Sequence, residues 1–296
     1  MSEEAIEIVD VTLRDGLQLL AEPVPLERKL ALLTAAAAAG IRRLEVGSFV
    51  NPRLMPGFAD TPAVLAAARA LPGLRPSVLV PNRRGFDLAV EAGAPEVVWV
   101  VSASQGHNQA NLRRSVETSL AELMPVLDDA RARGIHVRLA VATAFHCPFD
   151  GPTPHEAVFR ILDRAVEGGA LHEVVLADTI GHAVPQEAGA LFGAVRERHR
   201  GLLLGFHAHD TLGRALANIG AAFEAGCRVF DGALAGLGGC PYAPGAAGNA
   251  PTEAIAASFA RRGVPTGLDA GALARAGRIA ATFGAPSRVP PLDRAG

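Results

Sequence analysis

The sequence predicts an α/β fold in which eight strands, each followed by a helix, close into a (β/α)8 TIM barrel. Short apolar runs rich in β-branched residues alternate with segments of helical period along the whole chain. Eight such units within about 260 residues favour a closed parallel barrel. The alternative is an open doubly wound sheet, but no G-x-G-x-x-G motif follows the first expected strand.

The individual elements follow from this alternation. Strands are expected at 6–13, 41–49, 75–81, 96–104, 136–143, 172–179, 202–210 and 227–236. Helical period marks 25–39, 60–71, 114–133 and 211–225, and glycine closes several of these segments, as a helix stop does. A last helical piece at 268–284 is expected to pack outside the barrel. We therefore expect one domain over 1–296, with the barrel at about 6–264 and a C-terminal helical extension at about 265–296.

Composition excludes several classes of function. The chain is 49% hydrophobic and 20% charged with a net charge of −2, and its basic residues form no long patch, so nucleic acid is not an expected partner. The longest apolar run, at 30–41, is too short and alanine-rich to span a membrane. Three cysteines in 296 residues do not make a disulfide framework, which favours a reduced, cytoplasmic protein.

The single lysine, Lys29, lies in the first turns of an expected amphipathic helix, where a lysine is normally solvated. Schiff-base aldolases and pyridoxal phosphate enzymes need a buried, activated lysine, and a P-loop needs one after its glycines. The sequence therefore favours a metal ion as the electrophile for any carbonyl chemistry.

Two histidines and a carboxylate predict where such a metal would bind. His207 and His209 form an H-x-H pair at the end of the seventh expected strand, where residues i and i+2 share a side. Arg14 and Asp15 are expected to end the first strand, at the same mouth of the barrel. A carboxylate beside two imidazoles suits Mg²⁺ or Mn²⁺ when further oxygen ligands are present. The alternatives are two ordinary histidines and a surface Arg–Asp pair at a turn.

Other acidic and amide side chains extend this candidate site. Glu45, near the end of the second strand, is costly to bury without a partner, and Arg14 is the natural one. Asp178 ends the sixth strand in the same way, or else caps a helix. Asn249 offers either an amide oxygen to a metal or a helix cap, and Glu253, about one turn further on, could hold Asn249 or the preceding loop.

The three cysteines differ in their surroundings. Cys227 opens the eighth strand and is expected in the core. Cys147 is near the catalytic face, and both a structural and a functional interpretation remain open. Cys240 lies within "AGLGGCPYAPGAAGN" at 235–249, where glycines would let a loop close over a ligand and deliver a thiol on closure.

Several motifs together resemble 3-hydroxy-3-methylglutaryl-CoA lyase, of the DRE-TIM metallolyases. They are "RDGLQ", "GSFV", "PNRRGFDLAV", "DTIG", "HAHDTLGRALAN" and the cysteine loop, and the resemblance covers about residues 8–285. It implies a metal-dependent carbon–carbon lyase, an acyl-CoA substrate and a homodimer. The metal ligands would be Asp15, His207, His209 and Asn249, and Cys240 would be a catalytic thiol on a mobile loop.

The resemblance also implies a retro-Claisen cleavage that releases acetyl-CoA and a 3-oxo acid. Arg14 would polarise the thioester carbonyl with help from Glu45, and either His207 or Asp15 would act as base. Residues expected to line or support the substrate site are Gln18, Ser48, Asn111, Asp178, Thr179 and Glu253.

The chain departs from this family beside the site. Leu19, Leu20 and Ala21 stand where the family has polar or basic residues, and Ala140 replaces an aromatic residue on the fifth strand. Such changes favour a bulkier or less polar 3-substituent than methyl. Two rival functions remain: a related Claisen-type synthase or 4-hydroxy-2-oxoacid aldolase, and a non-catalytic binding protein.

Overall fold

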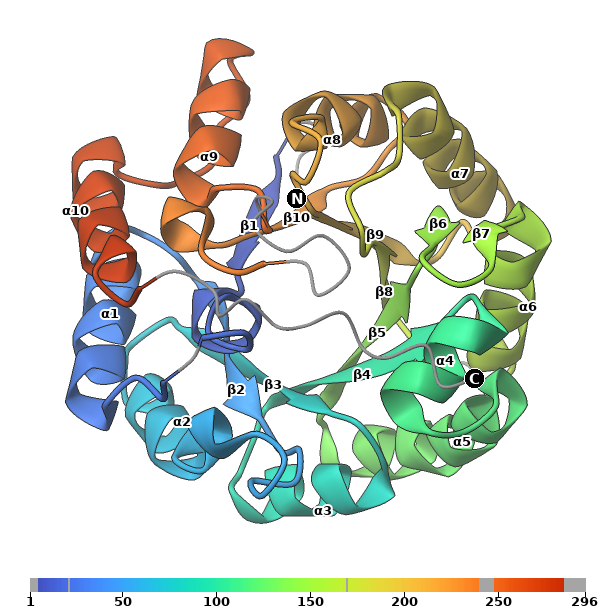
Figure 1. Ribbon diagram of the computed structural model, residues 1–296, viewed down its shortest axis with the longest axis horizontal. Coiled ribbons are helices and arrows are strands. Elements are labelled where there is room, and N and C mark those ends of the chain that lie inside the picture. Colours follow the sequence, from blue (N-terminus) through green and yellow to red (C-terminus); the bar gives the residue numbers. More distant parts are fainter. Residues whose placement is uncertain (1–4, 21, 169, 240–247, 285–296) are drawn as a thin grey trace.

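The computed structural model describes residues 5–20, 22–168, 170–239 and 248–284. Its parallel strands close into a barrel in the order β1-β10-β9-β8-β5-β4-β3-β2, which confirms the TIM-barrel prediction (Figure 1). The strands are β1 (Glu7–Asp10), β2 (Arg43–Ser48), β3 (Arg75–Val80), β4 (Glu96–Ser102), β5 (His136–Ala142), β8 (Glu173–Asp178), β9 (Leu203–Ala208) and β10 (Val229–Gly232). Each strand lies within the range expected from the sequence.

The helices form a ring around the barrel (Figure 1). They are α1 (Leu26–Ala38), α2 (Thr61–Arg69), α3 (Arg83–Glu91), α4 (Gln105–Leu112), α5 (Val116–Arg133), α6 (His155–Val166), α7 (Pro185–Arg198), α8 (Ala215–Glu224) and α9 (Thr252–Arg261). The predicted C-terminal helix is α10 (Ala270–Ala281). The Asp269 side chain caps it, and it packs against α1 outside the barrel. In the described part of the chain, no helix is both long and apolar enough to cross a membrane.

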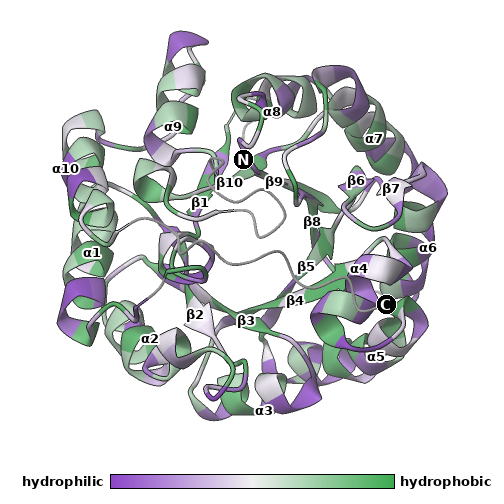
Figure 2. Ribbon diagram, in the orientation of Figure 1, coloured by the Kyte–Doolittle hydropathy of each residue, from purple (hydrophilic) through white to green (hydrophobic). Residues whose placement is uncertain are grey.

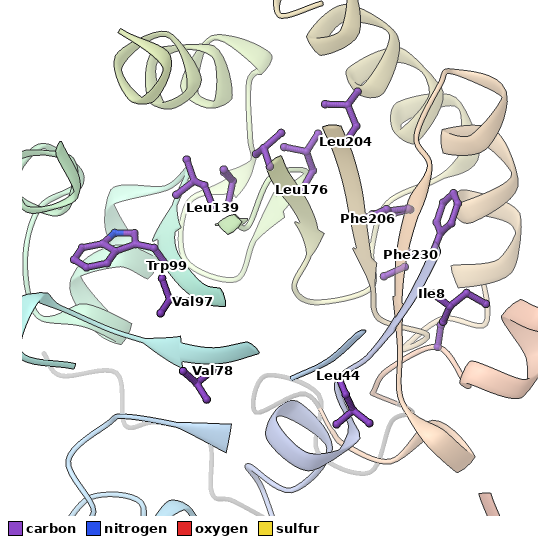
Figure 3. Close-up of a cluster of buried hydrophobic side chains, with 14 of the residues drawn as sticks. Ile8, Leu44, Val78, Val97, Trp99, Leu139, Leu176, Leu204, Phe206 and Phe230 are labelled. Carbon is purple, nitrogen blue, oxygen red and sulfur yellow. The ribbon is translucent and has the colours of Figure 1, made fainter. Parts of the chain in front are cut away.

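The apolar core fills the space between the strands and the helices. Figure 2 shows the strands as mainly hydrophobic, and Figure 3 shows buried side chains that project from them toward the helices, among them Leu44, Trp99, Leu139 and Phe206. Successive residues of a strand face opposite sides. The neighbours of these apolar residues therefore point into the barrel.

The inward positions hold a buried ionic ladder, which consists of Arg43, Glu96, Glu173, Arg138 and Asp231. Arg43 donates from Nη2 to Glu96 (2.7 Å) and to Glu173 (2.8 Å). Arg138 donates from Nε to Glu173 (2.6 Å) and grips both oxygens of Asp231 at 2.6 and 3.1 Å. All five side chains are buried, and a charge is tolerated there only because each has a partner of opposite sign.

The structure corrects the expected first strand, which is shorter than 6–13. The strand β1 ends at Asp10, and Thr12–Gly16 form a π-helical turn, η1. The Asp10 carboxylate accepts the Thr12 backbone N–H at 3.1 Å, and the Thr12 hydroxyl accepts the Leu234 backbone N–H at 2.7 Å. These side chain–backbone bonds turn the chain away from the sheet. Arg14 and Asp15 are therefore presented by η1 rather than by the strand end.

The structure also corrects the expectation that Lys29 is solvated. Its side chain is buried, and Nζ donates to the Gly57 carbonyl and to the Asp60 carboxylate, each at 2.6 Å. These contacts join α1 to the 3-10 turn η2 (Pro56–Phe58), outside the barrel. Lys29 is thus a structural anchor, and a metal remains the favoured electrophile.

Candidate metal centre and active site

Asp15, His207 and His209 converge at the mouth of the barrel. One ligand atom from each lies within 4.8 Å of the others. Asp15 Oδ2 is 3.6 Å from His209 Nε2 and 4.0 Å from His207 Nε2. The turn η1 brings in the carboxylate, and β9 with the residue after it supplies the imidazoles. One carboxylate and two imidazoles facing one point are a donor set that fits a divalent ion.

Asn249 lies beside these three residues. Its Nδ2 donates to Asp15 Oδ2 at 2.8 Å and to the Leu237 carbonyl at 3.0 Å. Its neighbour Gly238 has φ +126°, and a Cβ there would lie 2.5 Å from the same nitrogen, so only glycine allows this approach. Asn249 does not cap the next helix, because the N-cap residue of α9 is Pro251.

The buried Glu45 pairs with the partly buried Arg14 at the edge of this cluster, as the sequence predicted. Arg14 donates from Nε to Glu45 Oε2 at 2.8 Å, and from Nη1 to Asp15 Oδ1 and Gln18 Oε1. Burial disfavours the Asp15 anion, yet Arg14, His209 and His207 outweigh it and hold the pKa of this carboxyl well below its usual range. Burial raises the pKa of Glu45 even though Arg14 is beside it.

The other ring nitrogen of His207 is held by a residue that the sequence reasoning missed. Nδ1 lies 3.2 Å from Asp231 Oδ2, and the two residues are register partners on β9 and β10. Burial opposes the Asp231 anion, but Arg138 outweighs it and lowers the pKa of Asp231 to about 2. The signal in the sequence was an aspartate inside the apolar strand "RVFDG".

The remaining predicted substrate-site residues hold loops and strands in this structure. Asp178 accepts the backbone N–H groups of His182 (3.0 Å) and Ala183 (3.1 Å), so it fixes the loop after β8 and is not the N-cap of α7. Thr179 accepts the Thr143 backbone N–H at 2.7 Å.

Three further predicted residues come from separate elements. Ser48 is buried at the end of β2 and donates to the Leu79 carbonyl at 3.2 Å. Asn111 is exposed on α4. Glu253 accepts the Ala235 backbone N–H at 3.1 Å, so it holds the loop after β10, as the sequence suggested, rather than Asn249.

The described cysteines have structural surroundings. Cys227 is buried in the core as predicted, and burial raises the pKa of its thiol. Cys147 is also buried, with Sγ 2.8 Å from the Ser104 hydroxyl and two backbone N–H groups directed at it. The structural interpretation therefore accounts for Cys147. Cys240 and Ala21 lie outside the described residues.

A pocket of about 210 Å³, lined mainly by apolar residues, includes Gln18, which contacts Arg14. The residues that line it are Leu17, Gln18, Leu20, Glu22, Pro23, Val24, Leu54, Met55, Pro56, Gly57 and Phe58. Gln18 lines the pocket and also contacts Arg14, because its amide oxygen is 3.5 Å from Arg14 Nη1. Leu20 lines this pocket, which is connected to Arg14 through Gln18.

The barrel and its mouth define a TIM-barrel protein with a candidate divalent-metal centre. The HMGL-like family matches residues 5–279, and the chain belongs to that family. An (R)-citramalyl-CoA lyase of Chloroflexus aurantiacus is 42% identical to this chain, and the match covers 96% of this chain and 92% of that relative. A 3-hydroxy-3-isohexenylglutaryl-CoA/hydroxymethylglutaryl-CoA lyase of Pseudomonas aeruginosa is 39% identical to this chain, and the match covers 94% of this chain and 93% of that relative.

A solved structure extends the similarity. An HMG-CoA lyase of Acinetobacter baumannii, in complex with coenzyme A and 3-methylmalate, has a TM-score of 0.89 and 35% identity to this chain. The match covers all of this chain and 96% of that one. These relatives are carbon–carbon lyases, and the chain is an enzyme of that class.

Proposed function

We propose that the chain cleaves 3-hydroxy-3-methylglutaryl-CoA, or a related 3-hydroxy-3-alkyl acyl-CoA ester, to acetyl-CoA and a 3-oxo acid. The observation that carries this proposal is the convergence of Asp15, His207 and His209 beside the Arg14–Glu45 ion pair. The names of the relatives support the same reaction class. Mg²⁺ or Mn²⁺ is the proposed cofactor.

Asp15, His207 and His209 would hold the ion, joined by Asn249 if its amide turned to present oxygen. When bound, the ion would supply Lewis-acid stabilisation of the charge that develops on the substrate 3-hydroxyl. The carbon–carbon bond between C2 and C3 then breaks, and its electron pair passes into the thioester as an enolate. Arg14 would donate to this enolate oxygen, and Glu45, which accepts from Arg14 Nε, would hold the guanidinium in position.

Proton transfers complete the reaction. The 3-hydroxyl proton goes to a base, for which Asp15 and His207 are the candidates. His207 has one ring nitrogen available, because Nδ1 faces Asp231, so Nε2 serves either as ligand or as base and not as both. We propose Cys240 as the group that protonates C2 of the enolate and so forms acetyl-CoA.

The apolar pocket favours a 3-substituent larger than methyl. Leu17, Leu20 and Leu54 line it next to Gln18, and it has room for a short alkyl chain. Lys29 fixes one of its walls through Gly57. By its name, the Pseudomonas aeruginosa relative acts on an isohexenyl as well as a methyl compound, which supports this extension of the substrate class.

The substrate class is tested by incubating the enzyme and Mn²⁺ with three esters: the 3-methylglutaryl compound, a longer 3-alkyl homologue and citramalyl-CoA. We expect acetyl-CoA from the glutaryl esters, with the larger kcat/KM for the longer one, and no release after chelation with EDTA. A clear preference for the methyl ester would refute the pocket argument. Free thiol from acetyl-CoA and a 2-oxo acid, with no cleavage of any ester, would support a synthase instead.

Assembly and location form a separate part of the proposal. We propose a homodimer in the cytoplasm, on the strength of the family resemblance and of the free thiols of Cys147 and Cys227. Light scattering coupled to size-exclusion chromatography measures the assembly directly, and a monomeric mass would contradict the dimer.

A further inference from the structure

We propose that Asp231, itself fixed by Arg138, is the positioning residue for His207. In this role Asp231 holds the imidazole in the tautomer whose Nε2 lone pair faces Asp15. This inference rests on the proposed function, because it concerns a ligand of the proposed metal centre. It assigns a role to two buried residues, Asp231 and Arg138, that lie outside the candidate ligand set of Asp15, His207 and His209.

The first support is the geometry around the Asp231 carboxylate. Oδ2 accepts from His207 Nδ1 at 3.2 Å and from Arg138 Nη1 at 3.1 Å, while Oδ1 accepts from Arg138 Nη2 at 2.6 Å. An acceptor at Nδ1 places the ring hydrogen there and leaves Nε2 as the basic nitrogen. Nε2 is the atom that lies 4.0 Å from Asp15 Oδ2.

The second support is that the barrel is built to let Arg138 reach Asp231. Arg138 starts on β5 and crosses the interior, where its guanidinium is almost fully buried. Gly205 on β9 leaves the space, since a Cβ there would lie 3.1 Å from Arg138 Nη2. Glu173, the register partner of Arg138, accepts its Nε at 2.6 Å, so the guanidinium is fixed on both sides.

Replacing the carboxylate by an amide should disturb the imidazole specifically. In Asp231→Asn only one oxygen remains for three donors. If that oxygen stays with Arg138 Nη2, the amide N–H₂ faces His207 Nδ1 and forces the hydrogen to Nε2. If the amide turns over, its N–H₂ meets Arg138 Nη2 across a 2.6 Å contact. Either orientation weakens the metal site or unpairs a buried arginine.

The test is a Mn²⁺ titration of the purified full chain, followed by electron paramagnetic resonance, for wild type and Asp231→Asn. We expect the variant to bind Mn²⁺ about 10–100-fold more weakly. The matched control is Glu96→Gln, which removes a charge from the same ladder at its far end, on Arg43. Mn²⁺ affinity in this control should stay within about twofold of wild type, since Glu96 does not touch His207.

Two further measurements keep the outcomes distinct. Burial opposes the charged imidazole of His207, but Asp231 and Asp15 outweigh it and raise the pKa, so the ¹⁵N NMR spectrum is recorded on the metal-free protein at alkaline pH, where the imidazole is neutral. It should report His207 with its hydrogen on Nδ1 in wild type and on Nε2 in Asp231→Asn. If that variant does not fold, Arg138→Lys replaces it. Lysine keeps the charge but loses the bidentate hydrogen bonds to Asp231, and an intermediate loss of Mn²⁺ affinity is expected. Unchanged Mn²⁺ affinity, or an equal loss in Glu96→Gln, would overturn the inference. Absence of Mn²⁺ binding by wild type would overturn the proposed metal centre itself.

Discussion

Asp10 should make the protein less stable as the pH rises from 4 to 7. Its carboxylate is buried at the end of β1 and accepts from the Thr12 N–H and the Thr252 hydroxyl. Burial raises its pKa from 3.8 to about 6, because these bonds only partly replace hydration. The folded state therefore holds the proton more tightly than the unfolded chain. This stabilisation is complete below pH 4 and is lost as the pH rises through the pKa that Asp10 has in the folded state.

The size of the effect follows from that shift. Each unit of pKa is about 1.4 kcal/mol, so a shift of about two units corresponds to about 3 kcal/mol in total. Between pH 4.5 and 7.5, wild type should lose about 2 kcal/mol of this contribution to its free energy of unfolding. In Asp10→Asn the hydrogen-bonding shape is kept and the titration is removed. The free energy of unfolding of the variant should therefore rise relative to wild type by about that amount over this interval.

Urea unfolding followed by circular dichroism at several pH values measures this difference. The control is Asp163→Asn, because Arg198 lowers the pKa of the partly exposed Asp163 carboxyl. Its proton uptake therefore falls below pH 4, and its stability difference from wild type should stay constant between pH 4.5 and 7.5. If wild type and Asp10→Asn keep a constant difference in stability from pH 4.5 to 7.5, the reasoning about Asp10 is wrong. A constant difference would also remove the argument that Asp10 anchors η1 as a buried, proton-linked group.

Three other substitutions test separate parts of the structure. Glu45→Gln should lower kcat by about 10–100-fold, because Arg14 loses its buried anion, while Mn²⁺ affinity is largely kept; an unchanged kcat would refute its role. His107 has a pKa lowered to about 4 by burial, so its stabilising contribution is complete above pH 6.5 and falls by about 3 kcal/mol toward pH 4. His107→Gln should flatten that acid limb in urea unfolding, and an identical acid limb would contradict the assignment. Lys29→Met should destabilise the fold by about 3 kcal/mol, because Asp60 and the Gly57 carbonyl lose their cation; a change below about 1 kcal/mol would count against this anchor.

The strands and the helices α1, α2, α5, α8 and α10 could be predicted because their signals are local. Alternating apolar runs, glycine stops and capping residues decide where each element begins and ends, and the order of elements decides the barrel. The convergence of Asp15 with His207 and His209 could also be foreseen, since strand ends of a parallel barrel meet at one mouth. The π-helical turn was not foreseeable, because it depends on a bond from the Leu234 backbone to Thr12, far apart in sequence.

The ionic ladder was missed for a different reason. Glu96, Arg138 and Asp231 are each the one Asp, Glu, Arg or Lys residue of an apolar strand, and Arg43 shares β2 with Glu45. Sequence alone does not show which of these charges meet across a barrel. The usable signal was the repeated occurrence of a charged residue inside otherwise apolar strands, where an unpaired charge is very costly. The burial of Lys29 is similar, because its partner Asp60 lies on a different element.

The most direct test of the account is a product balance for wild type and Asp15→Asn with 3-hydroxy-3-methylglutaryl-CoA and Mn²⁺. Wild type should form acetyl-CoA and acetoacetate in equal amounts as the ester disappears. Asp15→Asn, and wild type with EDTA, should lose this cleavage while keeping the circular dichroism of the folded barrel. Cleavage that persists at the wild-type rate in Asp15→Asn, or under EDTA, would contradict a metal-centred carbon–carbon lyase.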